Sequence, residues 1–266
     1  MGNLRDITLR ALDVLAGADV VAAEDTRNTS HLLKHHGIHA GRLIAVHQHN
    51  ERGAAEKLAA MISAGQSVAF VSDAGTPAVS DPGALLVQQV LAAGLRVIPV
   101  PGPSAAVAAL SASGLAAPHF LFYGFLPNKC AARCAALQEL ADHRYTLVFY
   151  EAPHRIVECV ADLRSVLGGD RRIVFARELT KLFETIHSCT LEQAGEWLQS
   201  DANQQRGEFV VLVSGAEPGA GIPAEVRATL SLLLAELPLK QAAQLAAKIT
   251  GANRSELYQL ALQMKE

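Results

Sequence analysis

The stretch Ser72-Asp73-Ala74-Gly75-Thr76-Pro77, continued by Ser80-Asp81-Pro82-Gly83, follows directly on the apolar run at residues 68–71 (VAFV). A short apolar run bounded by turn residues predicts a buried strand, and glycine and proline after it predict a loop that can approach a ligand closely. In open α/β sheets, ligands bind beyond the carboxyl ends of the strands. We therefore expect residues 72–83 to form one wall of a ligand site.

A second loop of the same kind follows further along the chain. Residues 96–100 (RVIPV) predict a strand, and Pro101-Gly102-Pro103-Ser104-Ala105 comes next and leads into a helix over residues 105–113. Because the carboxyl ends of neighbouring parallel strands meet at one edge of a sheet, we expect the two loops to share one cleft.

The first part of the chain alternates short apolar runs with helical periods. Helices are expected over residues 54–64 and 84–93, and each stops at a glycine, Gly65 or Gly94. Alternation of strands and helices indicates right-handed crossovers and a mostly parallel sheet. The strands of this sheet are expected at residues 20–23, 43–46, 68–71 and 97–100.

A second unit begins near Pro118, and its strands outnumber its helices. We therefore expect neighbouring strands there to be partly antiparallel. The strands are expected at residues 120–123, 147–150, 173–176, 185–187 and 209–213, and the helices at 130–140, 155–167 and 191–199.

The C-terminal part resembles a helix-turn-helix, with helices over residues 224–236, 239–250 and 254–264. A structural helical hairpin is at least as well supported as a nucleic-acid reader, because Lys240, Lys248 and Arg254 supply the positive charge of its last two helices. The predicted organisation is an α/β domain at 1–117, a second α/β domain at 118–216, a linker at 217–223 and a helical domain at 224–266.

Composition excludes several classes of protein. With 266 residues, half of them hydrophobic, the chain can bury a large core, and its formal net charge of −3 gives no overall attraction to nucleic acid. No apolar stretch reaches the roughly 18 to 20 residues that span a bilayer, and no signal-peptide pattern opens the chain. We expect a cytoplasmic protein without a membrane partner.

The cysteines and histidines do not have the spacing of a familiar metal site. Cys130 and Cys134 stand four apart in a helical stretch, but zinc would need two further ligands, so we predict idle thiols and no metal. His31 and His35 lack an accompanying HExxH motif. Neither a G-x-G-x-x-G after a strand nor a phosphate-binding P-loop motif occurs, which disfavours dinucleotide binding and P-loop nucleotide hydrolysis.

Seven motifs in order resemble one known family. They are Gly2-Asn3-Leu4 with Asp6-Ile7-Thr8, Ala23-Glu24-Asp25-Thr26-Arg27, residues 72–77, Pro99-Val100-Pro101-Gly102-Pro103-Ser104, Gly124-Phe125-Leu126-Pro127, Tyr150-Glu151-Ala152-Pro153-His154-Arg155 and Ala176-Arg177-Glu178-Leu179-Thr180-Lys181. Together they closely resemble the RsmI type of ribosomal RNA methyltransferase, a branch of the tetrapyrrole (corrin/porphyrin) methylase superfamily. The resemblance covers nearly the whole chain.

The resemblance implies two α/β domains of the tetrapyrrole methylase type with a small C-terminal helical extension. It further implies S-adenosyl-L-methionine in the cleft between the domains and 2′-O-methylation of a decoding-region cytidine of 16S rRNA in the 30S subunit. We also expect a homodimer. The residues that match the cofactor-binding motifs are Gly2, Asn3, Asp73, Gly75, Thr76, Pro101, Gly102, Ser104, Ala105, Tyr150 and Pro153, with Glu151 in the same wall.

Methyl transfer to a hydroxyl is an in-line displacement that a base assists by removing the hydroxyl proton. The candidate bases are Asp25, Glu151 and Glu178, with Glu24 beside them, although each of these could instead cap a loop or pair with a cation. The candidate RNA contacts are Arg27, Lys129, Arg155, Arg177 and Lys181. For Lys129 and for Arg133, a solvated charged surface is an equally good explanation.

The family pattern has an apolar strand and a Thr-Pro-Ile-like turn before Gly-Asn-Leu, whereas this sequence opens at Met1-Gly2-Asn3-Leu4. We expect the first sheet to lack that strand, at a cost of ~1 to 3 kcal/mol for each buried backbone group left unpaired. One wall of the cofactor pocket would then be incomplete. The expectation is either that the reading frame starts upstream or that this chain is poorly active.

Two alternatives to RNA methylation stay open. Methylation of a tetrapyrrole would use the same cofactor and fold, although residues 23–27 and 176–181 and the C-terminal helices favour the RNA branch. A non-catalytic nucleic-acid-binding regulator would use the C-terminal helices alone and would bind RNA or DNA in a salt-sensitive way.

Overall fold

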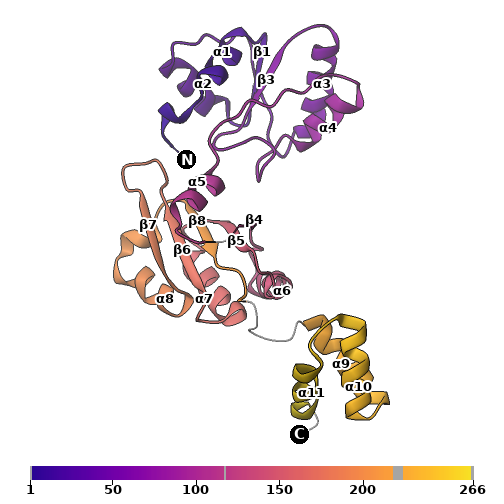
Figure 1. Ribbon diagram of the computed structural model, residues 1–266. Coiled ribbons are helices and arrows are strands. Elements are labelled where there is room, and N and C mark those ends of the chain that lie inside the picture. Colours follow the sequence, from indigo (N-terminus) through magenta and orange to yellow (C-terminus); the bar gives the residue numbers. More distant parts are fainter. Residues whose placement is uncertain (1, 117, 218–223, 265–266) are drawn as a thin grey trace.

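The computed structural model describes residues 2–116, 118–217 and 224–264 (Figure 1). Of the predicted linker at 217–223, residues 218–223 lie outside the described part of the chain. Among the described residues, no helix is both long enough and apolar enough to cross a bilayer.

The N-terminal unit is a parallel three-stranded sheet covered by helices on both faces. The strand order is β2-β1-β3, with β1 at Val20–Ala23, β2 at Leu43–Ala45 and β3 at Val68–Val71. The short helix η1 (Leu4–Asp6) precedes α1 (Leu9–Gly17). The other helices of the unit are α2 (Thr26–His35), α3 (Glu51–Ser63) and α4 (Ala84–Ala92).

Strand β1 is buried on both faces because its alternate side chains point into two separate cores. Val20 and Ala22 pack with residues of α3 and α4, whereas Val21 packs with Leu15 of α1 and Leu33 of α2. This arrangement explains why β1 is apolar throughout, as strands covered on both faces are. The predicted strands at 20–23 and 68–71 are confirmed, and the strand predicted at 43–46 ends one residue earlier.

The strand predicted at residues 97–100 is wrong. Residues 95–104 contain no helix or strand, and β3 pairs only with β1 among the described residues. A strand needs a partner for its backbone groups, and Pro99 has no N–H to donate. Side chains from the N-terminal segment contact this one instead, since Thr8 Oγ1 donates to Pro101 O (3.1 Å) and Arg10 Nη2 donates to Pro99 O (3.4 Å).

The second sheet is mixed and has the strand order β4-β5-β8-β6-β7. Only β4 and β5 are parallel, and the pairs β5·β8, β8·β6 and β6·β7 are antiparallel, which confirms the predicted character of this unit. The five strands are β4 (Phe120–Phe125), β5 (Thr146–Glu151), β6 (Arg172–Arg177), β7 (Thr185–Thr190) and β8 (Phe209–Val213).

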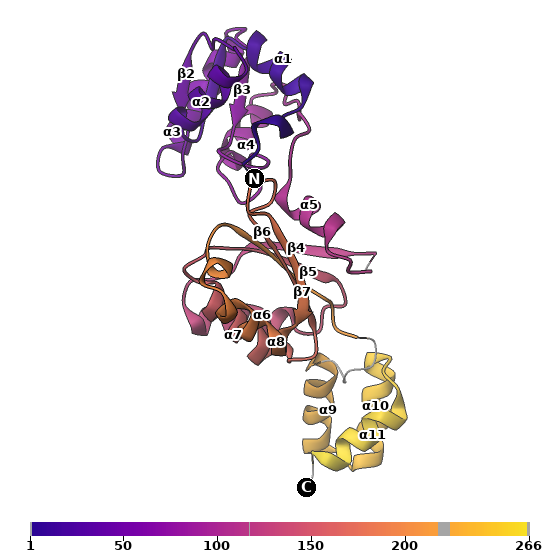
Figure 2. The same cartoon turned by 90° about the vertical axis from the view of Figure 1, so that its left-hand side faces the viewer.

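Helices cover the two faces of this sheet unequally, as Figure 2 shows. On one face, α6 (Cys130–Leu140), α7 (Ile156–Leu167) and α8 (Leu191–Ser200) enclose the largest core, and the short helix η2 (Ala202–Gln205) follows α8. On the other face lies α5 (Ala105–Ala112), whose Ala106 and Ala109 pack against Val148 and Leu212. The small side chains of α5 allow this close packing. The domain boundary predicted at residue 117 stays a prediction. Helix α5 precedes that boundary in the sequence, yet it packs on the second sheet, which follows the boundary.

The C-terminal helices are α9 (Ala224–Glu236), α10 (Leu239–Thr250) and α11 (Arg254–Gln263), which enclose a small core of their own. Gly251 ends α10 in the left-handed conformation (φ +74°), which favours glycine. The Asn253 side chain then accepts a hydrogen bond from the Ser255 amide (2.8 Å), so Asn253 is the N-cap of α11.

Candidate cofactor and substrate site

A pocket of about 360 Å³ lies between the loop after β3 and one edge of the second sheet. Both Gly/Pro loops contribute to it, as predicted, and the Thr76 hydroxyl donates to Pro103 O (3.4 Å) to join them. The lining residues are Ala74, Gly75, Thr76, Val79, Ser80 and Asp81 from the first loop, Ser104 and Ala105 at the start of α5, and Phe125, Tyr150, Glu151, Ala152, Pro153, Ala176, Leu179, Glu208, Phe209 and Val210 from the second sheet and its loops.

The register of the second sheet explains why its lining residues meet. Tyr150 at the end of β5 and Ala176 at the end of β6 both pair with Val210 at the start of β8. Because β8 runs antiparallel to both neighbours, its first residues lie beside their last ones. Residues far apart in the sequence therefore form one continuous wall.

Backbone strain is concentrated in the loops of this pocket. Within the described residues, the non-glycine residues with positive φ are Ala78 (66°), Ser80 (61°), Glu178 (52°) and Thr180 (68°). The first two belong to the loop after β3, and the other two flank the lining residue Leu179. Such strain costs of order 1 to 3 kcal/mol at each residue and tends to persist where it serves a function.

The chemistry of the lining favours a ligand that carries positive charge. No described lining residue is a lysine, arginine or histidine, whereas Asp81, Glu151 and Glu208 are acidic. Phe125 and Tyr150 supply aromatic surface beside small residues of the two loops. A cation with a flat, mainly apolar part fits this lining, and a phosphate group does not.

The surroundings of Asp81 shift its acidity. Burial, together with the negative charges of Glu24 and Asp73, raises the pKa of Asp81 to about 6, although Ser72 donates a hydrogen bond that opposes the rise. A carboxylate with a pKa near neutrality can accept a proton more readily than an ordinary one. Asp81 therefore has the acidity of a candidate base.

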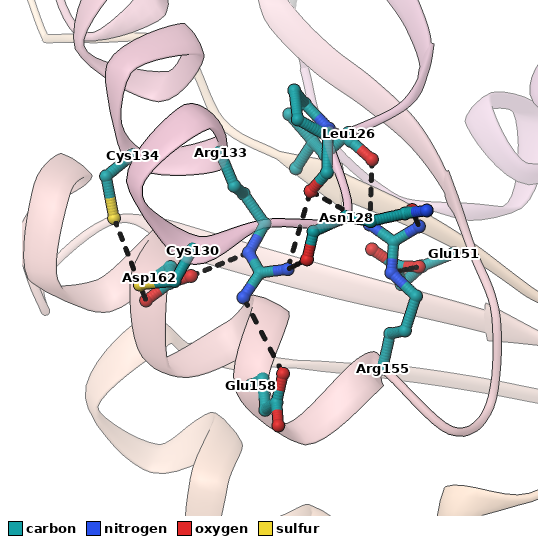
Figure 3. Close-up of polar contacts among 10 residues, drawn as sticks. Leu126, Asn128, Cys130, Arg133, Cys134, Glu151, Arg155, Glu158 and Asp162 are labelled. Carbon is teal, nitrogen blue, oxygen red and sulfur yellow. Dashed lines mark hydrogen bonds and ion pairs between the residues drawn. The ribbon is translucent and has the colours of Figure 1, made fainter.

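Glu151 is buried and held by the start of the next helix (Figure 3). Its Oε1 accepts a hydrogen bond from the Ala152 amide (2.8 Å) and lies 3.2 Å from Arg155 Nε. Its Oε2 is buried and has no hydrogen-bond partner among the described residues. The Glu151 side chain is also in hydrogen-bond contact with the buried Cys159 thiol of α7, so it is held on the side of that helix.

The pocket brings together six of the predicted cofactor-binding residues. These are Gly75, Thr76, Ser104, Ala105, Tyr150 and Pro153, and the expected wall residue Glu151 lies with them. They come from both units and from three separate motifs.

Five predicted cofactor-binding residues are not among the lining residues. Asp73 accepts hydrogen bonds from the Asp25 amide (3.1 Å) and Asn28 Nδ2 (3.0 Å), which ties the loop to the start of α2. The Asn3 side chain accepts from the Arg5 amide within η1 (3.0 Å). The other three are Pro101, whose carbonyl accepts from Thr8; Gly102, beside it; and Gly2, whose amide donates to Thr180 Oγ1 (3.3 Å).

Two of the predicted bases are paired with cations outside the lining. Arg27 holds Asp25 through a 2.6 Å ion pair and lowers the pKa of Asp25 to about 2, so Asp25 is a weak proton acceptor. Burial alone would raise the pKa of Glu178, but hydrogen bonds from Lys181 and the Glu208 amide hold that pKa below its usual value. Glu24 accepts from the Asp73 amide (3.2 Å).

The predicted RNA-contact residues divide into buried and exposed groups. Arg155 donates to Leu126 O (2.7 Å) and Pro127 O (3.2 Å), and Arg177 donates to Phe183 O (3.1 Å) and Arg206 O (3.2 Å). These buried guanidinium groups satisfy internal carbonyls. The exposed candidates are Arg27, with an 89% exposed side chain, and Lys129, while Lys181 bridges Glu178 and Glu208 at a partly exposed position.

Sequence reasoning did not select Asp81 and Glu208 as site residues. Asp81 belongs to the segment Ser80-Asp81-Pro82-Gly83 of the first Gly/Pro loop. The position of that loop after a strand could have indicated Asp81 as a site residue. Glu208 precedes β8 and reaches the pocket only because β8 is antiparallel. A single sequence does not reveal that pairing.

Fold and site define a methylase of the tetrapyrrole type. Residues 1–195 match the family model described as Tetrapyrrole (Corrin/Porphyrin) Methylases. The solved structure of the methyltransferase CobJ covers 81% of this chain and 90% of its own, with a TM-score of 0.60 and 22% identity. The uroporphyrin-III-C-methyltransferase from Thermus thermophilus gives a TM-score of 0.57 at 22% identity, over 80% of this chain and 90% of its own. These likenesses confirm the predicted fold class.

Curated relatives narrow the family further. A protein named "Ribosomal RNA small subunit methyltransferase I" from Pseudomonas aeruginosa is 54% identical over 99% of this chain and 94% of its own length. A protein of the same name from Escherichia coli O157:H7 is 49% identical over 100% of this chain and 93% of its own. Residues 220–265 match the model described as RsmI C-terminal HTH domain. The chain belongs to the ribosomal RNA small subunit methyltransferase I family, as its motifs predict.

Proposed function

We propose that this protein transfers the methyl group of S-adenosylmethionine to the 2′-hydroxyl of a decoding-region cytidine in 16S ribosomal RNA. The observation that carries the proposal is the acidic, small-residue pocket between the two α/β units, in a chain 54% identical to a curated small-subunit methyltransferase. The 30S subunit as substrate, a cytoplasmic location and a homodimer belong to the same proposal.

The lining residues suit S-adenosylmethionine. When bound, this cofactor supplies a methyl group on a positively charged sulfur, together with an ammonium group and an adenine ring. Asp81 complements those charges, whereas Glu151 and Glu208 are already paired with Arg155 and Lys181. Phe125 and Tyr150 offer apolar surface to a flat ring. A volume of about 360 Å³ lies within the range of small-molecule sites.

The methyl carbon must form a bond to the hydroxyl oxygen as its bond to sulfur breaks, with the bonding electron pair going to sulfur. The hydroxyl proton must leave at the same time. Asp81 is the lining carboxylate whose pKa, about 6, suits that proton. We assign it the role of base in place of the earlier candidates Asp25, Glu151 and Glu178, because each of those is paired with a cation. Alignment within the pocket can contribute ~7 to 11 kcal/mol of barrier lowering.

RNA contact is assigned to cations outside the acidic pocket. Arg27, Lys129 and Lys181 have exposed or partly exposed side chains that can approach phosphates. Arg155 and Arg177 act as positioning residues, because their guanidinium groups bind internal carbonyls. The C-terminal helices add exposed lysines and an arginine, and the match to a C-terminal HTH model supports a role in RNA binding.

The test is methyl transfer from labelled S-adenosylmethionine to 30S subunits that lack the modification, followed by nuclease mapping of the labelled nucleotide. The expected result is one labelled 2′-O-methylcytidine in the decoding region. Asp81→Asn should abolish most of the transfer, and Glu139→Gln, on the exposed surface of α6, is the matched control. Label in a tetrapyrrole, or none in RNA, would overturn the proposal.

A further inference from the structure

Two thiols and one carboxylate form a cluster on α6 and α7, outside the pocket (Figure 3). Cys130 begins α6, Cys134 lies one turn further along that helix, and Asp162 comes from α7. Cys130 Sγ is 4.0 Å from Cys134 Sγ and 3.4 Å from Asp162 Oδ1, and ligand atoms of all three residues lie within 4.8 Å of one another. Among the described residues, no other group of three or more histidine, cysteine, aspartate or glutamate side chains brings its ligand atoms this close together.

These distances match those of a tetrahedral zinc site. Zinc binds cysteine sulfur at about 2.3 Å and carboxylate oxygen at about 2.0 to 2.2 Å, which sets neighbouring sulfurs about 3.8 Å apart and a sulfur and an oxygen about 3.5 Å apart. The observed separations are 4.0 Å and 3.4 Å. The third separation, between Cys134 Sγ and the ligand oxygen of Asp162, is within 4.8 Å.

The position of Asp162 is fixed from the opposite side by Arg133. Arg133 Nε donates to Asp162 Oδ2 at 2.6 Å, and the arginine side chain is only 1% exposed. This pair occupies one carboxylate oxygen and directs the other, Oδ1, toward Cys130. A carboxylate held in this way loses little conformational freedom when it binds a metal.

The charges of the cluster call for a divalent cation. Two thiolates and one carboxylate carry three negative charges, of which the Arg133 guanidinium neutralises one. A 2+ ion would neutralise the remainder. Cys130 is exposed, so an ion and a water molecule can reach the site.

We propose that Cys130, Cys134 and Asp162 bind a thiophilic divalent cation of the Zn²⁺ type, with water as the fourth ligand. Binding forms two metal–sulfur bonds and releases the two thiol protons to solvent. The spacing in the sequence does not reveal this cluster, because Asp162 lies 32 residues after Cys130 and meets it only through the packing of α6 on α7.

The test is titration of the full, reduced chain with Cd²⁺, followed by the ultraviolet absorption of cadmium–thiolate bonds, and with Zn²⁺ in competition with a chromophoric chelator. A phosphine reductant prevents disulfide formation throughout. The expected result is one equivalent of Cd²⁺ with thiolate absorption, and Zn²⁺ that displaces it. Thiol labelling of Cys130 and Cys134 should slow when the metal is added.

Cys130→Ser and Cys134→Ser should each weaken binding more than about tenfold and lower the thiolate absorption by at least half, because each removes one of the two sulfur ligands. Neither variant touches Arg133, whereas substitution of Asp162 would leave that buried arginine without its partner. Cys189→Ser, at a buried thiol on β7, is the matched control and should bind as the parent does. Absence of metal binding under reductant, or binding unchanged in Cys130→Ser, would overturn the proposal.

Discussion

Arg155 Nε lies 3.2 Å from Glu151 Oε1 in a pair whose side chains are 13% and 0% exposed. Arg155→Ala would leave the Glu151 charge buried beside the pocket and remove the donors to Leu126 O and Pro127 O. We expect a loss of about 3 to 5 kcal/mol in the free energy of unfolding, measured in urea. Adding Glu151→Gln to that variant should recover part of the loss, because it removes the uncompensated charge. A loss below about 1 kcal/mol would contradict this reading.

Asp81 predicts the pH dependence of methyl transfer. A base must be deprotonated, so the rate should fall as the pH drops through about 6, the raised pKa of Asp81. Asp81→Asn should lower the rate by roughly 10²- to 10⁴-fold and remove that inflection from the pH profile. If Asp81→Asn kept the inflection near pH 6 in the rate profile, a group other than Asp81 would be the base.

The same carboxyl group predicts a pH dependence of stability with a definite sign. Because the folded-state pKa of Asp81 is raised, mainly by burial, the group favours folding in its protonated form. That contribution is full below the unfolded pKa of about 3.9 and is lost as the pH rises through about 6. Asp81→Asn should therefore raise the melting temperature at pH 8 and change it little at pH 4. An equal change at both pH values would contradict the assignment.

Most helices and strands of this chain could be predicted because they follow local patterns. The ends of α3 and α4 were readable from Gly65 and Gly94, which both have positive φ, and α6 has the predicted bounds. Residues 97–100 were misassigned because β-branched residues signal a strand only when a partner strand is present. Whether a strand forms depends on which other strands of the sheet lie beside it, and the sequence of one segment does not give that information.

The candidate site was predictable where the lining residues belong to a motif and unpredictable where packing decides. Thr76 and Tyr150 line the pocket from quoted motifs. Arg155 and Arg177 stand in equally strong motifs, yet both point into the protein and bind carbonyls. Charge in a sequence does not reveal burial. The contact between Cys130 and Asp162 likewise depends on the packing of α6 against α7, which the sequence alone does not show.

Gly83 tests the shape of the loop after β3. It has a φ of +129°, and a Cβ there would overlap the Phe70 ring. Gly83→Ala should therefore lower both the unfolding free energy and the affinity for S-adenosylmethionine, measured by urea unfolding and calorimetry. Gly94→Ala is the control, since Gly94 also has positive φ (+70°) but its Cβ would meet nothing within 4 Å. The control should cost about 1 to 2 kcal/mol and leave affinity unchanged. Equal losses in both variants would contradict a steric role for Phe70.

The C-terminal helices should contribute electrostatically to RNA affinity. Lys248 in α10 and Arg254 at the start of α11 are exposed and lie on either side of the turn at Gly251. If each contacts one phosphate, the double variant Lys248→Gln/Arg254→Gln should weaken 30S binding and reduce the slope of log affinity against log salt by roughly 2. Affinity for S-adenosylmethionine should not change, because neither residue lines the pocket. Lys57→Gln, exposed on α3, is the control. An unchanged salt slope in the double variant would show that Lys248 and Arg254 do not contact phosphates. The helices would then be a structural helical hairpin.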